Sequence, residues 1–187
     1  MRIITGKAKG IVLKTPAGEA TRPTAERVKE AVFSMLQFDI EGRSVLDLFA
    51  GSGQMGLEAL SRGAQEATFV DKSKEAIKLI KENIEKTRLS DNATVFQSDY
   101  LDFIRRNGGK KFDIFIIDPP YKLEMYNPAL KALIASNMIK NTSLIVCESG
   151  TDEIFNNDIE LQQRFDIAKQ NKYGNTFITI LKLHVED

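Results

Sequence analysis

The fold class is decided by Ser44-Val45-Leu46-Asp47-Leu48-Phe49-Ala50-Gly51-Ser52-Gly53-Gln54-Met55-Gly56. The first six residues form an apolar run typical of a buried strand, and the residues from 54 to 62 have the pattern of a helix. The glycines between them permit a tight turn and let a ligand approach the backbone. The stretch therefore predicts the strand-turn-helix unit of an α/β domain.

The remainder of the chain alternates between apolar runs and helical patterns. We expect strands over residues 67–71, 93–97, 112–117 and 143–148, separated by helices over 73–88, 100–106 and 128–138. Two more β-rich runs follow Phe165 without a helix between them, so they should form a hairpin with one antiparallel strand. This alternation predicts a Rossmann-like, mostly parallel seven-stranded sheet, preceded by a small β-hairpin within residues 1–20.

The composition is that of an ordinary soluble domain. The chain has 187 residues, of which 42% are hydrophobic, so we expect one domain spanning residues 1–187. Cys147 has no partner for a disulfide, and we find neither a signal peptide nor a run long enough to span a bilayer. These features predict a cytoplasmic protein, and no metal-ligand cluster is evident, so no metal is expected.

Asp47 narrows the choice of ligand at the glycine turn. The spacing G-x-G-x-x-G also occurs in dinucleotide-binding proteins, and a turn without a ligand is an ordinary alternative. A carboxylate just before the turn would repel a pyrophosphate, but it would attract the ammonium group of S-adenosylmethionine. We therefore expect S-adenosylmethionine as the cofactor, although Asp47 could instead be a capping or loop acid.

Acidic residues also follow the next two predicted strands. Asp71 is placed to accept the ribose hydroxyls, and Asp99 to accept the adenine amino group, with Tyr100 beside it. Asp99 could equally cap the helix that follows, and the two roles are compatible. The candidate cofactor-binding residues are Asp47, Phe49, Ala50, Gly51, Ser52, Gly53, Gly56, Asp71, Lys72, Asp99 and Tyr100.

The candidate catalytic residues are Asp118, Pro119, Pro120 and Tyr121, which follow the fourth predicted strand. The two prolines lack an N–H group and restrict the backbone, so the segment is rigid and rich in hydrogen-bond acceptors. An exocyclic amino group of a nucleic-acid base could donate to Asp118 and to the Pro119 carbonyl while Tyr121 stacks on the base. The motif therefore predicts methyl transfer to a base amine, whereas a simple proline-rich turn is the structural alternative.

The whole chain resembles the RsmD-type family of 16S ribosomal RNA guanine-N2 methyltransferases. The matching segments are residues 1–4, 21–24, 27–31, 47–53, 56–64, 70–71, 118–121 and 173–176, while Thr5 and Gln54-Met55 depart from the family's pattern. The resemblance implies the class I S-adenosylmethionine-dependent methyltransferase fold. It also implies methylation of the N2 amino group of a specific guanine, the guanine-966-type position, within an assembled small ribosomal subunit.

An excess of positive charge at the amino end suits an RNA partner. Although 26 basic residues balance 26 acidic residues overall, residues 1–29 are predominantly basic. These charges could form an ordinary solvated surface, or they could contact RNA phosphates. The candidate RNA-binding residues are Arg2, Lys7, Lys9, Arg22, Thr24 and Arg27, and Arg22 and Thr24 could alternatively contact the cofactor.

Other functions remain compatible with parts of this pattern. The same chemistry could act on adenine N6 or cytosine N4 of DNA, or on another RNA. A nicotinamide-dependent oxidoreductase could share the glycine pattern, and a non-catalytic module could retain the nucleoside pocket. Of these, we favour the ribosomal RNA enzyme, acting as a monomer.

Overall fold

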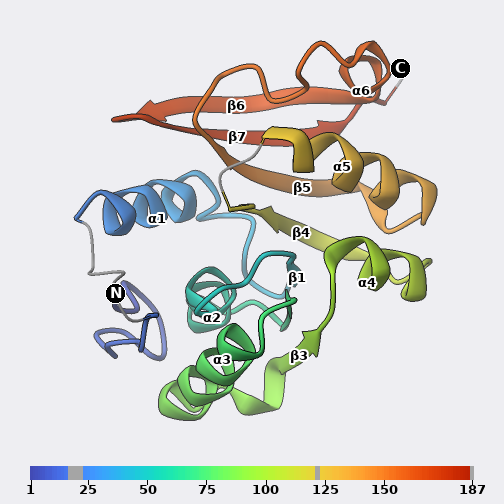
Figure 1. Cartoon of the computed structure of the whole chain (residues 1–187). Helices are drawn as coiled ribbons and strands as arrows, with labels where there is room; N and C mark the ends of the chain where they lie inside the picture. Colours follow the sequence, from blue (N-terminus) through green and yellow to red (C-terminus); the bar gives the residue numbers. More distant parts are fainter. Residues whose placement is uncertain (17–22, 121–122, 186–187) are drawn as a thin grey trace.

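Seven strands form one sheet in the order β3-β2-β1-β4-β5-β7-β6, as the computed structural model shows (Figure 1). The structure describes residues 1–16, 23–120 and 123–185, without the side chains of residues 23–25. The strands are β1 (Ser44–Asp47), β2 (Glu66–Asp71), β3 (Ala93–Gln97), β4 (Phe112–Ile117), β5 (Ile139–Ser149), β6 (Phe165–Tyr173) and β7 (Thr176–Leu183). The first five strands are parallel, and β7 lies antiparallel to both β5 and β6.

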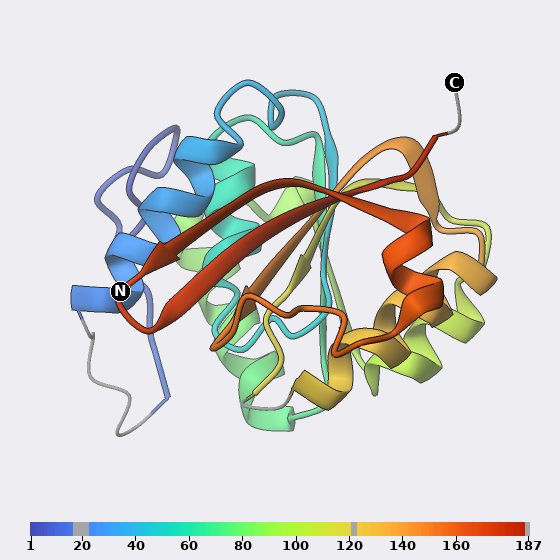
Figure 2. The same cartoon turned by 90° about the horizontal axis from the view of Figure 1, so that it is seen from above.

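Helices cover both faces of the sheet (Figures 1 and 2). The helices are α1 (Pro23–Met35), α2 (Gln54–Ser61), α3 (Lys74–Thr87), α4 (Tyr100–Arg106), α5 (Tyr126–Ala135) and α6 (Ile159–Arg164), with 3₁₀ turns η1 (Ser90–Asn92) and η2 (Leu123–Met125). Val32, Leu57 and Ile80 bury α1, α2 and α3 in one hydrophobic cluster. Phe103 and Leu133 bury α4 and α5 in a second cluster. Within the described ranges, no helix has the length and apolar character to cross a membrane.

The predicted alternation of strands and helices is confirmed, including the carboxyl-terminal β6–β7 hairpin. One boundary differs clearly, because α5 was expected to continue to residue 138. Asn137 adopts a left-handed backbone conformation with φ of 52°, which ends the helical region. Strand β5 then begins at Ile139, which pairs with Phe112 of β4.

The structure does not show the predicted amino-terminal hairpin as a pair of strands within residues 1–16. The structure has one isolated antiparallel bridge, between Arg2 and Val12. Hydrogen bonds from Ile3 N–H to the Ile11 carbonyl (2.9 Å) and from Gly10 N–H to the Ile3 carbonyl (2.8 Å) close the turn. Within residues 1–16 no ladder extends from this bridge, and the segment forms its other hydrogen bonds both within itself, as from Leu13 N–H to the Met1 carbonyl (2.8 Å), and with helices.

Helix α2 holds the amino-terminal segment in place through Ser61. The Ser61 hydroxyl donates to the Thr5 carbonyl (2.6 Å) and accepts from the Ala8 N–H (3.0 Å). A Cβ atom on Gly6 would lie 1.7 Å from the Ser61 carbonyl oxygen, so a larger residue cannot fit without displacing the segment. This packing and the backbone hydrogen bonds within the segment together determine the conformation of the first residues.

A buried side chain of α3 joins the same segment to the glycine turn. The Asn83 carboxamide oxygen accepts from the Lys14 N–H at 2.8 Å. Its nitrogen donates to the carbonyls of Lys14 and Ser52, both at 2.9 Å. Asn83 therefore connects two stretches of backbone that are far apart in the sequence.

A buried ion cluster links α1 to α2. Glu58 is fully buried, with its carboxylate 3.4 Å from the Lys29 ammonium and 2.8 Å from the Arg62 guanidinium nitrogen. The same carboxylate accepts from the backbone N–H groups of Ile4 (2.7 Å) and Thr5 (3.1 Å). Burial lowers the pKa of Lys29, and the charge of Glu58 opposes that shift. These contacts compensate for removing the charges from water.

Candidate active site

Acidic residues follow the neighbouring strands at one edge of the sheet. Asp47 is the last residue of β1 and Asp71 is the last residue of β2. Asp99 lies two residues after the end of β3, and Asp118 directly follows β4. Because these strands are parallel neighbours, their carboxyl ends meet at the same edge. The structure therefore brings together the four acids that the sequence singled out.

The glycine turn takes the form that its sequence predicts. Gly51 and Gly53 have φ values of 54° and 78°, a region that side chains disfavour. A Cβ atom on Gly56 would lie 2.3 Å from the Phe69 ring, so α2 packs directly against β2. The turn thus presents backbone atoms at the sheet edge.

Asp47 is buried beneath the start of α2. Asp47 is only 2% exposed, and its carboxylate accepts a hydrogen bond from the Gly56 N–H at 3.3 Å. Burial raises the pKa of Asp47 to about 7, and the charge of Asp71 adds to the shift, while the Gly56 hydrogen bond opposes it. A cation bound nearby would favour the ionised form.

Asp71 organises the turn from β2. Its carboxylate accepts from the N–H groups of Gly51 (2.9 Å) and Ser73 (2.8 Å). A carboxylate has about four acceptor positions, so donors from a ligand could still be accommodated. The neighbouring Lys72 is exposed.

After β3, Asp99 caps the start of α4 and Tyr100 packs against Phe49. Asp99 accepts from the Leu101 N–H at 2.9 Å, which confirms the helix-capping alternative. The Tyr100 ring lies 5.0 Å from the Phe49 ring between centroids, and Tyr100 is largely buried. Together these two rings provide an apolar surface beside the acidic edge.

Sequence reasoning missed Glu148, which lies next to Asp118. Ile117 of β4 pairs in parallel with Cys147 of β5, so the residues that follow each of them are also neighbours. Burial raises the pKa of Asp118 well above its usual value, and the charges of Glu148 and Asp47 raise it further. Burial also raises the pKa of Glu148. An acid at the end of the fifth strand was the available signal.

The surroundings of this pair are rigid. Pro119 is buried and Pro120 is exposed, whereas the predicted stacking residue Tyr121 lies outside the described residues. The buried Tyr126 hydroxyl donates to the Glu148 carbonyl and so fixes the end of β5 to α5. Burial raises the pKa of the Tyr126 hydroxyl, which keeps it protonated as the donor.

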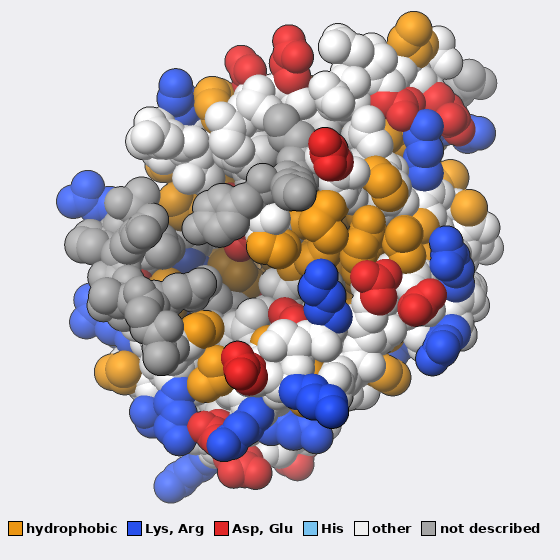
Figure 3. All heavy atoms as spheres, in the orientation of Figure 1, with side chains coloured by type: hydrophobic (Ala, Val, Ile, Leu, Met, Phe, Trp, Pro, Cys, Tyr) orange, Lys and Arg blue, Asp and Glu red, His pale blue; other side chains and the backbone are white. Residues whose placement is uncertain are grey.

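The proposed RNA-binding residues are only partly described. Arg2, Lys7, Lys9 and Arg27 are exposed, whereas Arg22 and the side chain of Thr24 fall outside the description. Lysines of α3, which the sequence reasoning did not include, are exposed, but glutamates of the same helix lie among them, so this surface carries charges of both signs (Figure 3). Lys29 contributes nothing to that surface, since it is buried against Glu58.

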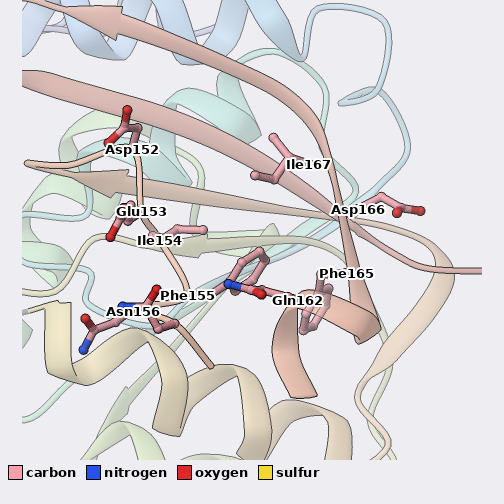
Figure 4. Close-up of a pocket in the computed structure, with 10 residues that line it drawn as sticks. Asp152, Glu153, Ile154, Phe155, Asn156, Gln162, Phe165, Asp166 and Ile167 are labelled. Atoms are coloured by element: carbon pink, nitrogen blue, oxygen red, sulfur yellow. The ribbon is translucent and has the colours of Figure 1, made fainter. Parts of the chain in front are cut away.

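A separate cavity of about 460 Å³ lies beyond the end of β5 (Figure 4). It is lined by residues 152–157, Gln162 and residues 165–167. Phe155 and Phe165 stack there with ring centroids 6.4 Å apart. None of these lining residues is a candidate cofactor-binding or catalytic residue.

The geometry agrees with comparisons to known proteins. Residues 1–182 match the family described as Conserved hypothetical protein 95. The chain is 36% identical over 155 residues to Ribosomal RNA small subunit methyltransferase D of Haemophilus influenzae, covering 82% of this chain and 80% of that protein. The chain belongs to the methyltransferase D family. It is therefore a member of a family of ribosomal RNA methyltransferases.

Solved structures support the fold of this methyltransferase D family member. The yhhF structure from Escherichia coli has 28% sequence identity and a TM-score of 0.86, covering 100% of this chain and 99% of that chain. The SMU.776 structure, solved in complex with S-adenosylhomocysteine, is 19% identical with a TM-score of 0.72 and covers 86% of this chain and 49% of that chain. The seven-stranded order with an antiparallel β7 is thus the class I methyltransferase fold.

Replacing Asp47 by asparagine should affect ligand binding and stability in opposite directions. If Asp47 binds the ammonium group of the ligand, as the sequence predicts, affinity for S-adenosylhomocysteine should fall at least about tenfold, because the charge-assisted hydrogen bond would be lost. We also expect the ligand-free variant to be more stable than the parent at pH 8. The raised pKa of Asp47 means that its contribution to stability is present at low pH and is lost as pH rises through about 7.

Calorimetry and urea unfolding at pH 5 and pH 8 test both expectations. Asp91→Asn, which changes an exposed acid of η1, is the matched control and should alter neither quantity. Unchanged affinity in Asp47→Asn would show that Asp47 does not bind the ammonium group.

Proposed function

We propose that this protein transfers the methyl group of S-adenosylmethionine to the exocyclic N2 amino group of a specific guanine in 16S ribosomal RNA. The observation that carries the proposal is the rigid acceptor edge at Asp118, beside a glycine turn with a buried acid at Asp47. An acceptor-rich edge suits an amine that must donate its hydrogens. The adjacent turn suits a nucleoside methyl donor that carries positive charge.

Three residues fit the methyl donor. Asp47 would accept from its ammonium group, directly or through water, and Asp71 would accept from its ribose hydroxyls. Gln54, which begins α2 immediately after the turn, has a buried side-chain oxygen with no hydrogen-bond partner among the described residues. A donor group of the ligand would satisfy that oxygen.

Asp118 and the Pro119 carbonyl would position the base amine. When both accept its hydrogens, the nitrogen lone pair is drawn out of conjugation with the ring and points toward the methyl carbon. The new carbon–nitrogen bond forms as the carbon–sulfur bond breaks, which leaves a thioether. The nitrogen must then lose one proton, and the raised pKa of Asp118 suits it to accept that proton.

The choice of ribosomal RNA rests on the family. The Haemophilus influenzae relative bears the name Ribosomal RNA small subunit methyltransferase D. The exposed basic residues Arg2, Lys7, Lys9 and Arg27 could contact phosphates while the target base leaves its stack. We propose the assembled small subunit as the substrate, as the sequence resemblance implies.

Methyl transfer to defined particles tests the proposal. Small subunits from a strain that lacks the enzyme are incubated with the protein and tritiated S-adenosylmethionine, and the RNA is digested to nucleosides. We expect the label in N2-methylguanosine. If neither these subunits nor free 16S RNA take up label, the proposed function is wrong.

Two parallel measurements identify the alternatives. Label in duplex oligonucleotides but not in RNA would indicate a DNA amino-methyltransferase. Calorimetric binding of NAD in preference to S-adenosylhomocysteine would indicate an oxidoreductase. We expect neither result, and against NAD we expect Asp47 to repel the pyrophosphate.

A further inference from the structure

Asp118 and Glu148 are adjacent, half-buried carboxylates that accept no hydrogen bond from the part of the chain that the structure describes. The parallel pairing of Ile117 with Cys147 places them side by side at the carboxyl ends of β4 and β5. Within the described ranges, neither carboxylate has a hydrogen bond or an ion pair. Partly buried acids without donors are costly unless a ligand supplies hydrogens, so the pair is suited to a ligand edge with several N–H groups.

Guanine has such an edge. Its N2 amino group carries two hydrogens, and the adjacent ring nitrogen N1 carries a third. In adenine and cytosine, the ring nitrogen beside the exocyclic amine carries no hydrogen and is an acceptor. A carboxylate next to the amine-binding group would therefore attract guanine and repel the ring nitrogen of the other two bases.

We propose that Glu148 determines the base specificity of the enzyme by accepting the N1–H of guanine. This inference rests on the proposed function, in which Asp118 and the Pro119 carbonyl accept the two hydrogens of the N2 amine. Glu148 lies beside Asp118 on the next strand, so one base edge can reach both acids. The hydrogen bond from Tyr126 to the Glu148 carbonyl holds this part of β5 in position.

The assignment explains how an enzyme whose Asp118 and Pro119 acceptors could bind any base amine selects guanine. Asp118 and Pro119 recognise only an amine, which guanine, adenine and cytosine all possess. Glu148 recognises the ring nitrogen next to the amine. That nitrogen carries a hydrogen in guanine but not in adenine or cytosine. Glu148 is thus a specificity-determining residue, whereas Asp118 is the residue that positions the reacting nitrogen.

A substrate that keeps the amine but lacks the N1 hydrogen tests this role directly. Small subunits are reconstituted with 16S RNA that carries either guanine or 2-aminopurine at the mapped methylation site. We expect the parent protein to prefer guanine in kcat/KM by at least about tenfold, as for loss of one base-specific contact. Glu148→Gln should reduce or reverse this preference, because its carboxamide can donate to the unprotonated ring nitrogen.

The ratio of the two kcat/KM values separates specificity from folding. A folding defect lowers both values together, and the intrinsic reactivity of 2-aminopurine is the same for every variant. Glu153→Gln, an exposed acid a few residues further along the chain, should keep the parent ratio.

Two outcomes would overturn the assignment for different reasons. If Glu148→Gln keeps the parent preference for guanine, Glu148 does not read N1, although the proposed function stands. If the parent labels no guanine in unmodified subunits or in free 16S RNA, the proposed function fails and this inference fails with it.

Discussion

Asp118→Ala should lower the turnover of methyl transfer at least about a hundredfold, the scale of a lost positioning contact. The variant can no longer draw the amine lone pair toward the methyl carbon, although its glycine turn and Asp47 are intact. We therefore expect affinity for S-adenosylhomocysteine to stay close to that of the parent. Single-turnover assays and calorimetry measure the two quantities separately.

The pH dependence of methyl transfer shows whether the negative charge of Asp118 matters or only its ability to accept a hydrogen bond. Burial and the charges of Glu148 and Asp47 raise its pKa, so protonation removes an acceptor at a higher pH than for an ordinary carboxyl group. Activity of the parent should fall as pH drops through that raised pKa. Asp118→Asn keeps a carbonyl acceptor, so it should retain more activity than Asp118→Ala and lose the Asp118 part of this pH dependence. Equal activity in Asp118→Ala and the parent would refute the positioning role.

Glu58→Gln should destabilise the protein by about 3 to 5 kcal/mol, as expected when one partner of a buried ion pair is removed. Glu58 is fully buried between Lys29 and Arg62, and its carboxylate also accepts two backbone N–H groups. The substitution leaves the Lys29 ammonium buried without its counter-charge. For a chain of this length, the thermal midpoint should fall by roughly 10 °C.

Urea unfolding with a matched control tests this expectation. Glu82→Gln makes the same chemical change in an exposed ion pair with Lys14, whose charged atoms are 2.8 Å apart, and should leave the unfolding free energy nearly unchanged. Combining Glu58→Gln with Lys29→Met should cost less than the sum of the single changes, because the two residues interact. Equal stability of Glu58→Gln and Glu82→Gln would show that the cluster is not stabilising.

Much of the sheet could be predicted because its strands are apolar runs separated by helical patterns. The spatial order of the strands could not be derived in the same way, because each pairing depends on the packing of distant elements. The interval between α5 and β5 shows a related difficulty. Asn137 ends the helix by adopting positive φ, and polar residues near Lys140 belong to the strand despite their character.

The differences between prediction and structure at the amino end have a common physical cause. The short β-like runs predicted a hairpin, yet the decisive partners are Glu58 and Ser61 of α2. Lys29 was counted with the basic segment, although its charge is buried against Glu58. Local composition cannot reveal such partners, because they lie dozens of residues away.

The candidate site was easier to predict than its specificity. Asp47, Asp71 and Asp118 belong to recognisable motifs that follow strands, and the structure places them at one edge. Glu148 belongs to no such motif, and only the pairing of β4 with β5 brings it beside Asp118. Treating the acidic residue at the carboxyl end of every predicted strand as a candidate would have included Glu148.

The carboxamide of Asn83 has a consequence for the order of events during synthesis. It joins Lys14 to the Ser52 carbonyl, and Lys14 precedes Asn83 by 69 residues. The beginning of the nascent chain therefore cannot complete its native contacts until α3 has left the ribosome exit tunnel. The amino-terminal segment, although translated first, becomes structured only after a large part of the sheet's first half is available.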